Sequence, residues 1–336
     1  MPRARYGAAV TGFTRRLPWT SLDVTVRAAV EEAVLASVGS AVQDSRDVHG
    51  GMSPGPAAVL TTTDGQQVFV KITSSELNER SYQLYADEIV AYHALAHLAL
   101  PMPELLSVVE HSAWIGLVLT VAPGVVPGPP WDAAALDDVA RACRQVGTVQ
   151  APDGLPPVLE RLPDLDGWEA LASDDDPLDE WHAVYARRCA DLVRGWRSWT
   201  TGRALAHNDV RCDNVLRAGG HGATLVDWNF ASRAAPWLDV AQLAADVMAS
   251  GISRGVTAGA AAPDREASTA SLAAARGLLA SLPEDAGRFV VALAGMLRRN
   301  STLPPHPALP TMRAWQAARA DRLQPLVEAL VPGLLS

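Results

Sequence analysis

The chain has 336 residues, which is enough for one large domain or two moderate ones with a sizeable core. Hydrophobic residues make up 49% and charged residues 19%, as in an ordinary globular protein and unlike a disordered one. The formal net charge is −9, and no basic stretch is available to neutralise nucleic-acid phosphates. We therefore expect no nucleic-acid partner, and the net charge weakly favours neutral or cationic ligands.

The composition also gives expectations about the compartment. No apolar run approaches the roughly 20 residues that cross a bilayer, and residues 1–5 lack the apolar block of a signal peptide. The cysteines are odd in number and far apart, which fits neither a disulfide framework nor a zinc site (Cys143, Cys189 and Cys212). We expect a cytoplasmic protein with no membrane partner, while the oligomeric state stays open.

The first part of the chain predicts a helix followed by a glycine-rich loop. Apolar residues at helical spacing predict a helix over residues 21–42, with Ser21 or Thr20 as its N-cap. Three glycines and Ser53 then lie in the segment 48–60, where the backbone can approach another group closely. A plain hairpin turn explains this segment about as well.

A second hairpin leads to a lysine of interest. Asp64-Gly65 is a typical two-residue turn, and a β-branched strand with Lys71 near its end follows. A lone lysine at a strand end usually faces water, but the predicted helix 82–98 carries Glu88, which can reach Lys71 as an ion pair. Glu79 and Asp87 are competing partners for the same lysine.

Two further strands, 105–109 and 115–121, precede a Pro- and Gly-rich stretch that starts at Pro123. We expect a domain boundary there, which divides the chain into residues 1–122 and 123–336. The second part is predicted to be mostly helical, with helices at 131–150, 178–199, 240–249, 268–281, 284–300 and 311–330.

An acidic cluster lies at residues 174–180, just before the second of these helices. A solvated loop with acids at a helix start explains it adequately. The alternative is an acidic rim that attracts a polycationic substrate.

The stretch 206–228 carries the chemistry. Asp209 is followed by Asn214 five residues later, and Asp227 ends an apolar run after a predicted hairpin. This order suits a phosphoryl-transfer site, in which one carboxylate meets the acceptor hydroxyl while an amide and a second carboxylate hold Mg²⁺ on the ATP phosphates. Asp209 is thus the candidate base, Asn214 and Asp227 are the candidate metal ligands, and Arg211 is placed to meet the γ-phosphate.

The same hypothesis assigns ATP contacts to the first part of the chain. Ser53 would lie on the loop over the phosphates, and Lys71, paired with Glu88, would bind them. The backbone from Thr120 to Ala122, at the strand exit, would bond the adenine edge.

The neighbours of these residues have ordinary structural explanations. His207 is better explained as a structural histidine that bonds the loop backbone than as a base. Asp213 is explained by solvation or by bracing the loop, and Cys212 by packing. Asp239 either caps the following helix or braces the loop from below.

The segments 206–216, 225–228 and 236–241 resemble the aminoglycoside phosphotransferase superfamily, which includes choline kinase-like enzymes. The His207-Asn208-Asp209 opening is similar to that of choline kinases, whereas most antibiotic kinases have Gly in the middle position. Residues 50–55, 68–71 and 309–316 are similar to an actinobacterial branch of these phosphotransferases.

The resemblance implies an α+β, protein-kinase-like fold with two lobes, a small N-terminal lobe with an antiparallel sheet and a larger, mostly α-helical C-terminal lobe. It implies ATP and Mg²⁺ as cofactors and a small-molecule hydroxyl as acceptor. By motif match, Asp209 is the base, Asn214 and Asp227 are the metal ligands, Lys71 is the phosphate lysine and Asp239 supports the loop. Trp228-Asn229 replaces the Phe-Gly that follows the metal Asp in protein kinases, so protein substrates are not expected.

The sequence thus predicts an ATP-dependent O-phosphotransferase of the antibiotic-kinase type, for which an aminoglycoside or another natural product is the acceptor. A metabolite kinase acting on choline, an amino alcohol or a sugar is the alternative enzyme. A nucleotide-binding pseudokinase scaffold is the alternative from another class, although Lys71, Asp209, Asn214 and Asp227 are all present.

Overall fold

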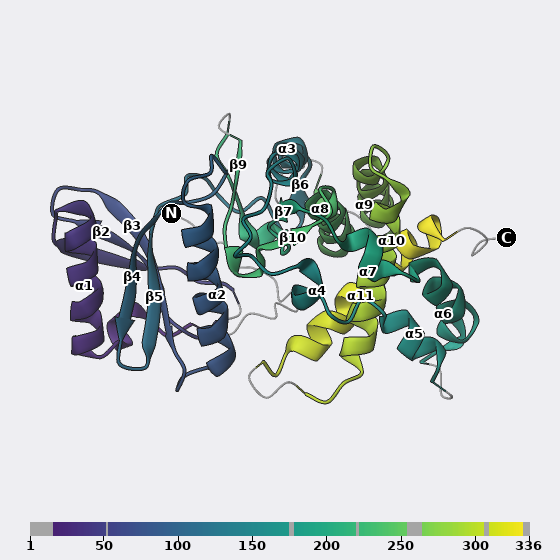
Figure 1. Ribbon diagram of the computed structural model, residues 1–336, viewed down its shortest axis with the longest axis horizontal. Coiled ribbons are helices and arrows are strands. Elements are labelled where there is room, and N and C mark those ends of the chain that lie inside the picture. The colour runs from purple at the N-terminus through teal and green to yellow at the C-terminus, as the bar shows by residue number, and fades with distance from the viewer. Residues whose placement is uncertain are drawn as a thin grey trace.

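The structure is a computed structural model that describes residues 16–51, 53–174, 178–219, 222–253, 264–305 and 309–331. It has two lobes side by side, one built on a sheet and the other mostly on helices (Figure 1). The α+β, two-lobed architecture predicted from the sequence is confirmed.

The small lobe contains a five-stranded antiparallel sheet in the order β1-β2-β3-β5-β4. Its strands are β1 (Val42–Asp47), β2 (Ala57–Thr62), β3 (Gln67–Ser74), β4 (Leu105–His111) and β5 (Trp114–Thr120). The predicted turn at Asp64-Gly65 joins β2 to β3, and Gly65 adopts a positive φ of 85° there. Its amide donates to the carbonyl of Thr62 at 2.9 Å, which closes the hairpin.

Two helices cover opposite faces of this sheet, α1 (Val24–Val38) and α2 (Glu79–Leu95) (Figure 1). Side chains alternate along β3, so Val68, Val70 and Ile72 pack on the α1 side. Lys71 therefore points to the other face, toward α2 and the large lobe.

The predicted N-cap of the first helix was wrong. Ser21 belongs to a short 3₁₀ turn, and the helix starts after Asp23, whose carboxylate accepts from the amide of Thr25 at 2.8 Å. The helix also ends before the predicted residue 42, because Gly39 adopts a left-handed φ of 75° and Val42 begins β1.

The large lobe is mostly helical. Its helices are α3 (Leu136–Gly147), α4 (Val158–Arg161), α5 (Gly167–Ala172), α6 (Glu180–Val193), α7 (Trp196–Thr200), α8 (Leu238–Ser250), α9 (Asp264–Leu279), α10 (Glu284–Ser301) and α11 (Met312–Leu330). Short strands pair between them: β6 (Trp131–Asp132) with β11 (Ile252–Ser253), β7 (Ala204–Ala206) with β10 (Ser232–Ala234), and β8 (Val215–Arg217) with β9 (Ala223–Leu225).

Two helix predictions in this lobe need correction. The helix expected from residue 131 starts only at Leu136, because Trp131 and Asp132 form a parallel strand pair with Ile252 and Ser253. The long helix expected over 178–199 is divided into α6 and α7, because Gly195 adopts a left-handed φ of 79° between them. The acidic cluster lies partly outside the described residues, since Asp175 and Asp176 are not among them.

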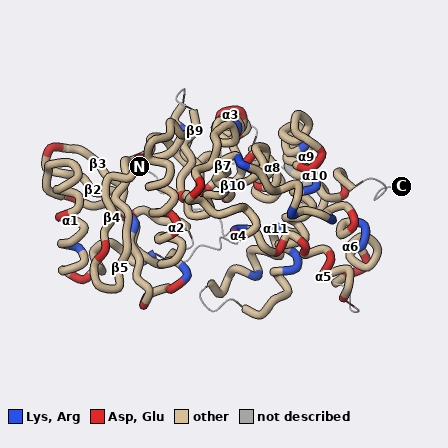
Figure 2. The backbone as a smooth tube through the Cα atoms, viewed as in Figure 1, with Lys and Arg blue, Asp and Glu red and all other residues tan. Residues whose placement is uncertain are grey.

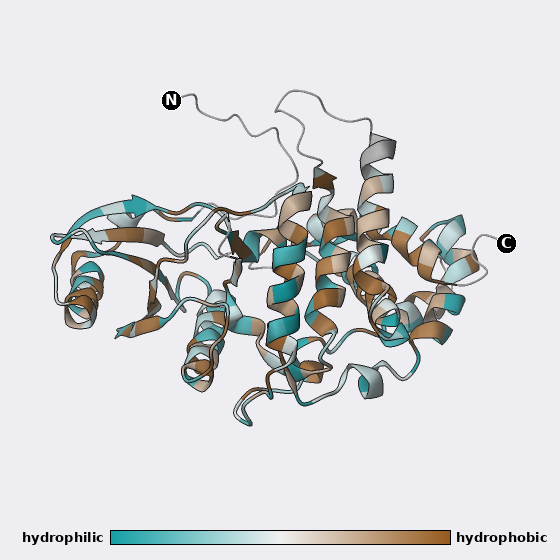
Figure 3. Ribbon diagram, turned by 90° about the horizontal axis from the view of Figure 1, so that it is seen from above, coloured by the Kyte–Doolittle hydropathy of each residue, from teal (hydrophilic) through white to brown (hydrophobic). Residues whose placement is uncertain are grey.

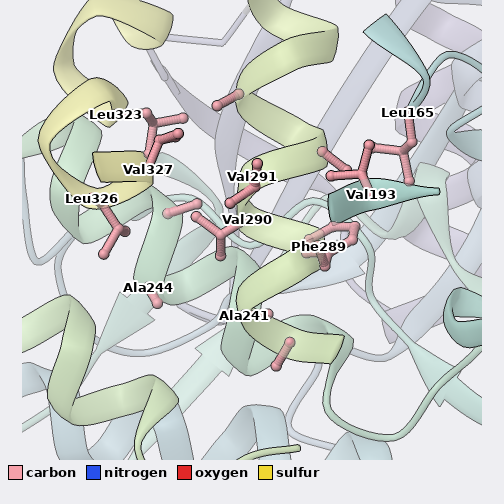
Figure 4. Packing of buried hydrophobic residues seen from close by; sticks show 14 of the residues in the cluster. Leu165, Val193, Ala241, Ala244, Phe289, Val290, Val291, Leu323, Leu326 and Val327 are labelled. Carbon is pink, nitrogen blue, oxygen red and sulfur yellow. The ribbon is translucent and has the colours of Figure 1, made fainter. Parts of the chain in front are cut away.

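The core of the large lobe is built around α10. The helices carry both hydrophilic and hydrophobic residues along their length, which allows an apolar side to face the interior (Figure 3). Phe289, Val290 and Val291 of α10 are fully buried between α8, α11 and the α5–α6 region (Figure 4). Gly295 lets Trp168 approach closely, because a Cβ at that position would lie 2.4 Å from the indole.

The buried carboxylate of Asp246 connects four segments of this lobe. Asp246 on α8 accepts from the indole of Trp131 at 2.8 Å, from the amide of Cys212 at 3.0 Å and from the guanidinium of Arg319 on α11 at 2.6 Å. Only 1% of Asp246 is exposed, and its bonds with Trp131 and Cys212 are fully buried.

Asp246→Ala is expected to lower the free energy of unfolding by roughly 3–5 kcal/mol, because it leaves Arg319 without its buried counter-charge. Urea denaturation measures this loss. Asp191→Ala, which removes an exposed ion pair with Arg194, is the control and is expected to change stability by about 0.5 kcal/mol or less. Equal losses in the two variants would contradict the role of Asp246.

Candidate active site

Lys71 is the point at which the two lobes meet. Its ammonium lies 2.6 Å from Glu88 of α2 and also pairs with Asp227 of the large lobe, so the structure brings these three predicted residues together. Lys71 is 3% exposed and Glu88 is fully buried, whereas 36% of the Asp227 side chain faces the cleft. Glu79 and Asp87, the competing partners, do not pair with Lys71; Asp87 binds Arg161 instead, at 2.8 Å.

The charges of this trio depend on burial and on one another. Burial disfavours a charged Asp227, but Lys71, Arg16 and Arg211 together outweigh burial and lower the pKa of Asp227 to about 2. Burial raises the pKa of Glu88 to about 7 despite the attraction of Lys71. The two carboxylates together keep the pKa of Lys71 above its usual value. Asp227 is therefore an anion that lines the cavity, where its carboxylate is available to bind a cation.

The loop 207–212 is held by polar side chains on a single face of α8. Asp239 accepts from the amides of His207 and Asn208 at 2.8 and 2.9 Å. Gln242 accepts from the amide of Val210 at 3.1 Å and donates to the side chain of Asn208 at 2.8 Å.

Asp246 completes this set one turn further along α8. The spacing from Asp239 to Gln242 to Asp246 is three and four residues, which places all three side chains on one side of the helix. The structure therefore shows Asp239 bracing the loop, whereas sequence reasoning missed Gln242 and Asp246. Three polar residues at helical spacing in a fully buried helix were the signal that could have found them.

His207 connects the loop to the strand that ends at Asp227. Its Nε2 lies 2.9 Å from the carbonyl of Val226, and its Nδ1 accepts from the amide of Asp209 at 3.3 Å. Burial lowers the pKa of His207, so the ring is neutral, as this pair of bonds requires. The arrangement fits a structural histidine.

Asn208 and Asp227 both adopt left-handed backbone conformations, with φ of 63° and 65°. Such conformations cost of order 1–3 kcal/mol for residues other than glycine, and they persist where the surroundings over-determine them. The bonds from Gln242 to Asn208 and from Lys71 to Asp227 are such surroundings. Strain at two points of one cleft is typical of a functional site.

Asp209 and Asn214 lie together at the end of this loop. The amide nitrogen of Asn214 donates to the carboxylate of Asp209 at 2.8 Å and to its backbone carbonyl at 2.9 Å. This leaves Oδ1 of Asn214 without a described hydrogen-bond donor. The β8–β9 hairpin follows Asn214 directly, and the amide of Val226 returns to the carbonyl of Asn214 at 3.0 Å, which brings Asp227 close.

Arg211 is partly engaged by neighbouring carboxylates. Its guanidinium makes two hydrogen bonds to Asp213, at 3.0 and 3.1 Å, and lies 3.7 Å from Asp209. Burial raises the pKa of Asp209, and Arg211 opposes this shift. Asp213 thus orients Arg211 beside the candidate base.

The glycine-rich loop lies between β1 and β2, as the extended segments around it indicated. Ser53 faces the cleft, and its hydroxyl accepts from the amide of Gly55 at 3.3 Å. Sequence reasoning missed Arg16, whose guanidinium donates to the carbonyls of Gly50 at 2.5 Å and Gly55 at 2.9 Å, and so joins the two sides of the loop. Gly51 beside it adopts a left-handed φ of 78°, which favours glycine at this position. No sequence pattern marks this arginine, which precedes the loop by more than thirty residues.

A cavity of about 410 Å³ joins these groups. It extends from Arg16 and Ser53, past Asp209 and Asp227, to the inner sides of α10 and α11. Five other predicted site residues do not line it (Lys71, Glu88, Asn214, Thr120 and Ala122). The amide of Thr120 is bonded to the carbonyl of Glu104 at 3.0 Å, so among the described hinge groups that amide is not free for a ligand.

In the described part of the chain, no group of three or more His, Cys, Asp or Glu side chains is placed to hold a metal ion. The hard oxygens of Asn214 and Asp227 nevertheless fit a magnesium site whose remaining ligands are phosphate oxygens and water. No helix in the described part of the chain is long and apolar enough to cross a membrane.

Comparison with known proteins identifies the family. The model of the phosphotransferase enzyme family matches residues 55–276, more than half of the chain. The chain belongs to the phosphotransferase enzyme family. The match includes Lys71, Glu88 and the loop from Asp209 to Asp227, whereas Arg16, Ser53 and α11 lie outside it.

Solved structures support the fold. The apo form of a thermostable mutant of aminoglycoside phosphotransferase APH(4)-Ia has a TM-score of 0.56 at 17% identity and covers 89% of this chain and 98% of its own. A ternary complex of that protein with ADP and hygromycin B has a TM-score of 0.55 at 18% identity, with 90% and 98% covered. Choline kinase LicA from Streptococcus pneumoniae has a TM-score of 0.52 at 14% identity, with 91% and 99% covered. No curated protein matches the chain.

Arg16→Ala is expected to raise the dissociation constant of Mg²⁺·ATP roughly tenfold, because it removes charge-assisted bonds that hold the glycine-rich loop and a cation that faces Asp227. Titration calorimetry measures the change. Arg46→Ala, at an exposed position on β1, is the control and is expected to keep wild-type affinity. Unchanged affinity in the Arg16 variant would show that the loop does not depend on this residue.

Activity is expected to fall as the pH drops through the raised pKa of Asp209, because the base acts as a carboxylate. Arg211→Gln removes the positive charge that lowers this pKa, so the acidic limb of its kcat/KM profile is expected to move to higher pH. Comparing the kcat/KM profiles of the wild type and of Arg211→Gln shows whether Asp209 or Glu88 is the titrating group, because Glu88 faces Lys71 and Asp227 instead of Arg211. A shift toward lower pH, or none, would be inconsistent with Asp209 as the titrating group.

Proposed function

We propose that this protein is an ATP- and Mg²⁺-dependent O-phosphotransferase that transfers the γ-phosphate to a hydroxyl of a small molecule, of the antibiotic-kinase type. The observation that supports this proposal is a pair of contacts beside one cavity: Lys71 pairs with Asp227, Asn214 donates to Asp209, and both carboxylates line the cavity. Each of the four residues has the chemistry that phosphoryl transfer requires, and Lys71 and Asp227 belong to different lobes.

In this proposal Asp209 accepts the proton of the acceptor hydroxyl and orients its oxygen. Lys71 binds ATP phosphate oxygens while Glu88 fixes its position, and Arg211 stabilises charge on the transferring group. Asn214 and Asp227 would hold Mg²⁺, which when bound neutralises the phosphate charge. Ser53 and the loop amides near Arg16 cover the phosphates, and the backbone from Thr120 to Ala122 is the proposed adenine contact.

The lobes are proposed to divide near residue 123, so that residues 1–122 hold the nucleotide and residues 123–336 hold the catalytic loop and the acceptor. The likeness to a ternary complex with ADP and hygromycin B supports a nucleotide and a small-molecule acceptor in one cleft. Three buried free thiols support a reducing, cytoplasmic location.

A metabolite kinase is the second candidate, and the structural likeness to a choline kinase favours it. The two candidates differ in the acceptor alone, so the same machinery serves both. A coupled assay of ADP release over amino-glycosides, other antibiotics, amino alcohols and sugars distinguishes them by the acceptor that is consumed.

Asp209→Asn is expected to reduce phosphoryl transfer by at least about 10²-fold while the dissociation constant of Mg²⁺·ATP stays within about twofold. ADP release and calorimetry measure the two effects. Asp44→Asn, on the exposed edge strand β1, is the matched control and is expected to keep full activity. Full activity of the Asp209 variant would overturn the assignment of the base, and nucleotide binding without transfer in the wild type would favour a pseudokinase.

A further inference from the structure

The acceptor end of the cavity has a wall made by α10, α11 and Leu309, which lies three residues before α11. Six of the nine members of this wall are apolar and at least partly buried (Leu293, Met296, Leu297, Leu309, Met312 and Trp315). The polar residues on the same wall include two neutral amides, Asn300 and Gln316. No Asp or Glu of α10 or α11 lines the cavity among the described residues.

Carboxylates elsewhere on the lining are few. Asp209 and Asp227 belong to the reacting centre, where the hydroxyl and the metal would engage them. This leaves Asp164, which is exposed at the rim. The described members of the acidic cluster before α6 (Asp174, Asp179 and Glu180) do not line the cavity, and acidic residues are spread over both lobes instead (Figure 2).

Guanidinium groups outnumber these carboxylates at the same end. Arg161 and Arg319 line it, and each is paired with a carboxylate that does not line the cavity (Asp87 and Asp246). Arg80 is exposed and has no described ion pair. The potential that an acceptor meets beyond the reacting centre is therefore neutral to positive, although the whole chain carries −9.

A polycation would be poorly accommodated there. Its ammonium groups would lose water beside an apolar wall and beside arginines, with one exposed carboxylate as compensation. An apolar body would instead gain from burial against the wall, at about 25 cal/mol per Å². The net charge of the chain is thus a poor guide to its ligand.

Within the phosphotransferase function proposed above, we infer that the acceptor is an amphiphilic alcohol without positive charge. Its apolar body packs against the wall of α10 and α11, and its hydroxyl reaches Asp209. A neutral polar or anionic group at the mouth lies near Arg80.

Three probes that share the octyl chain and the pyranose ring but differ in charge test the inference: octyl β-glucoside, the octyl glucuronide and the octyl glucosaminide, each below its micelle concentration. Binding is measured with Mg²⁺·ADP present by calorimetry, so that it does not depend on turnover. The neutral and anionic probes are expected to bind at least about tenfold more tightly than the cationic one. Tighter binding of the cationic probe, or no binding of any probe at millimolar concentration, would overturn the inference.

A variant of the wall gives an independent test. Met296→Glu places a carboxylate on the wall, so it is expected to weaken the neutral and anionic probes and to narrow or reverse the preference against the cationic one. Val184→Glu makes the same change at a position on α6 that is 58% exposed, and is expected to leave all three affinities unchanged. Thermal melts verify that both variants fold. An unchanged ranking in a folded Met296 variant would show that the probes bind elsewhere and would overturn the inference.

Hygromycin B and its N-acetylated form extend the comparison to phosphoryl transfer. The cationic form is expected to release no more ADP than the acetylated form, and a clear preference for the cationic form would contradict the inference. If the proposed function is wrong, no acceptor will give ADP release that depends on Asp209. The affinities of the three probes can still be ranked in that case, so the two failures are distinguishable.

Discussion

The candidate site depends on one helix that is buried on every side. α8 presents Asp239, Gln242 and Asp246 to the backbone of the loop 207–212, and these side chains satisfy amides that have no partner in a regular strand or helix. A loop held in this way keeps Asp209 fixed without any secondary structure of its own. The strained backbone of Asn208 is stabilised by Gln242, which donates to both its carbonyl and its side chain.

The second constraint lies between the lobes. Lys71 connects Glu88 of the small lobe to Asp227 of the large lobe, and His207 connects the strand before Asp227 to the amide of Asp209. Charge and hydrogen bonding thus run continuously from α2 to the catalytic loop. Movement of α2 relative to the large lobe would reach Asp227 first, because Lys71 connects Glu88 of α2 directly to Asp227.

Sequence reasoning predicted what is local or carried by a specific motif. The place of Lys71 near a strand end and the helix predicted after it were enough to propose Glu88 as its partner, with Glu79 and Asp87 as competitors. The 206–228 stretch was enough to place Asp209, Asn214 and Asp227 near one another. Helix boundaries failed at Asp23 and Gly195, where a single cap or a single left-handed residue overrides the apolar period. Arg16 could not be found in this way, because the carbonyls of Gly50 and Gly55 that it binds are brought to it only by the folded chain.

Asp246 has a consequence for how this protein could acquire new acceptors. Its carboxylate binds the catalytic loop through Cys212 and α11 through Arg319, so the wall that faces the acceptor and the loop that carries the base are parts of one frame. Side chains on the cavity side of α11, such as Met312, can therefore be exchanged while the frame stays in place. We infer that acceptor selectivity can change at such positions of α11, whereas Trp315, whose ring lies 5.8 Å from the guanidinium of Arg211, is coupled to the loop that carries Asp209.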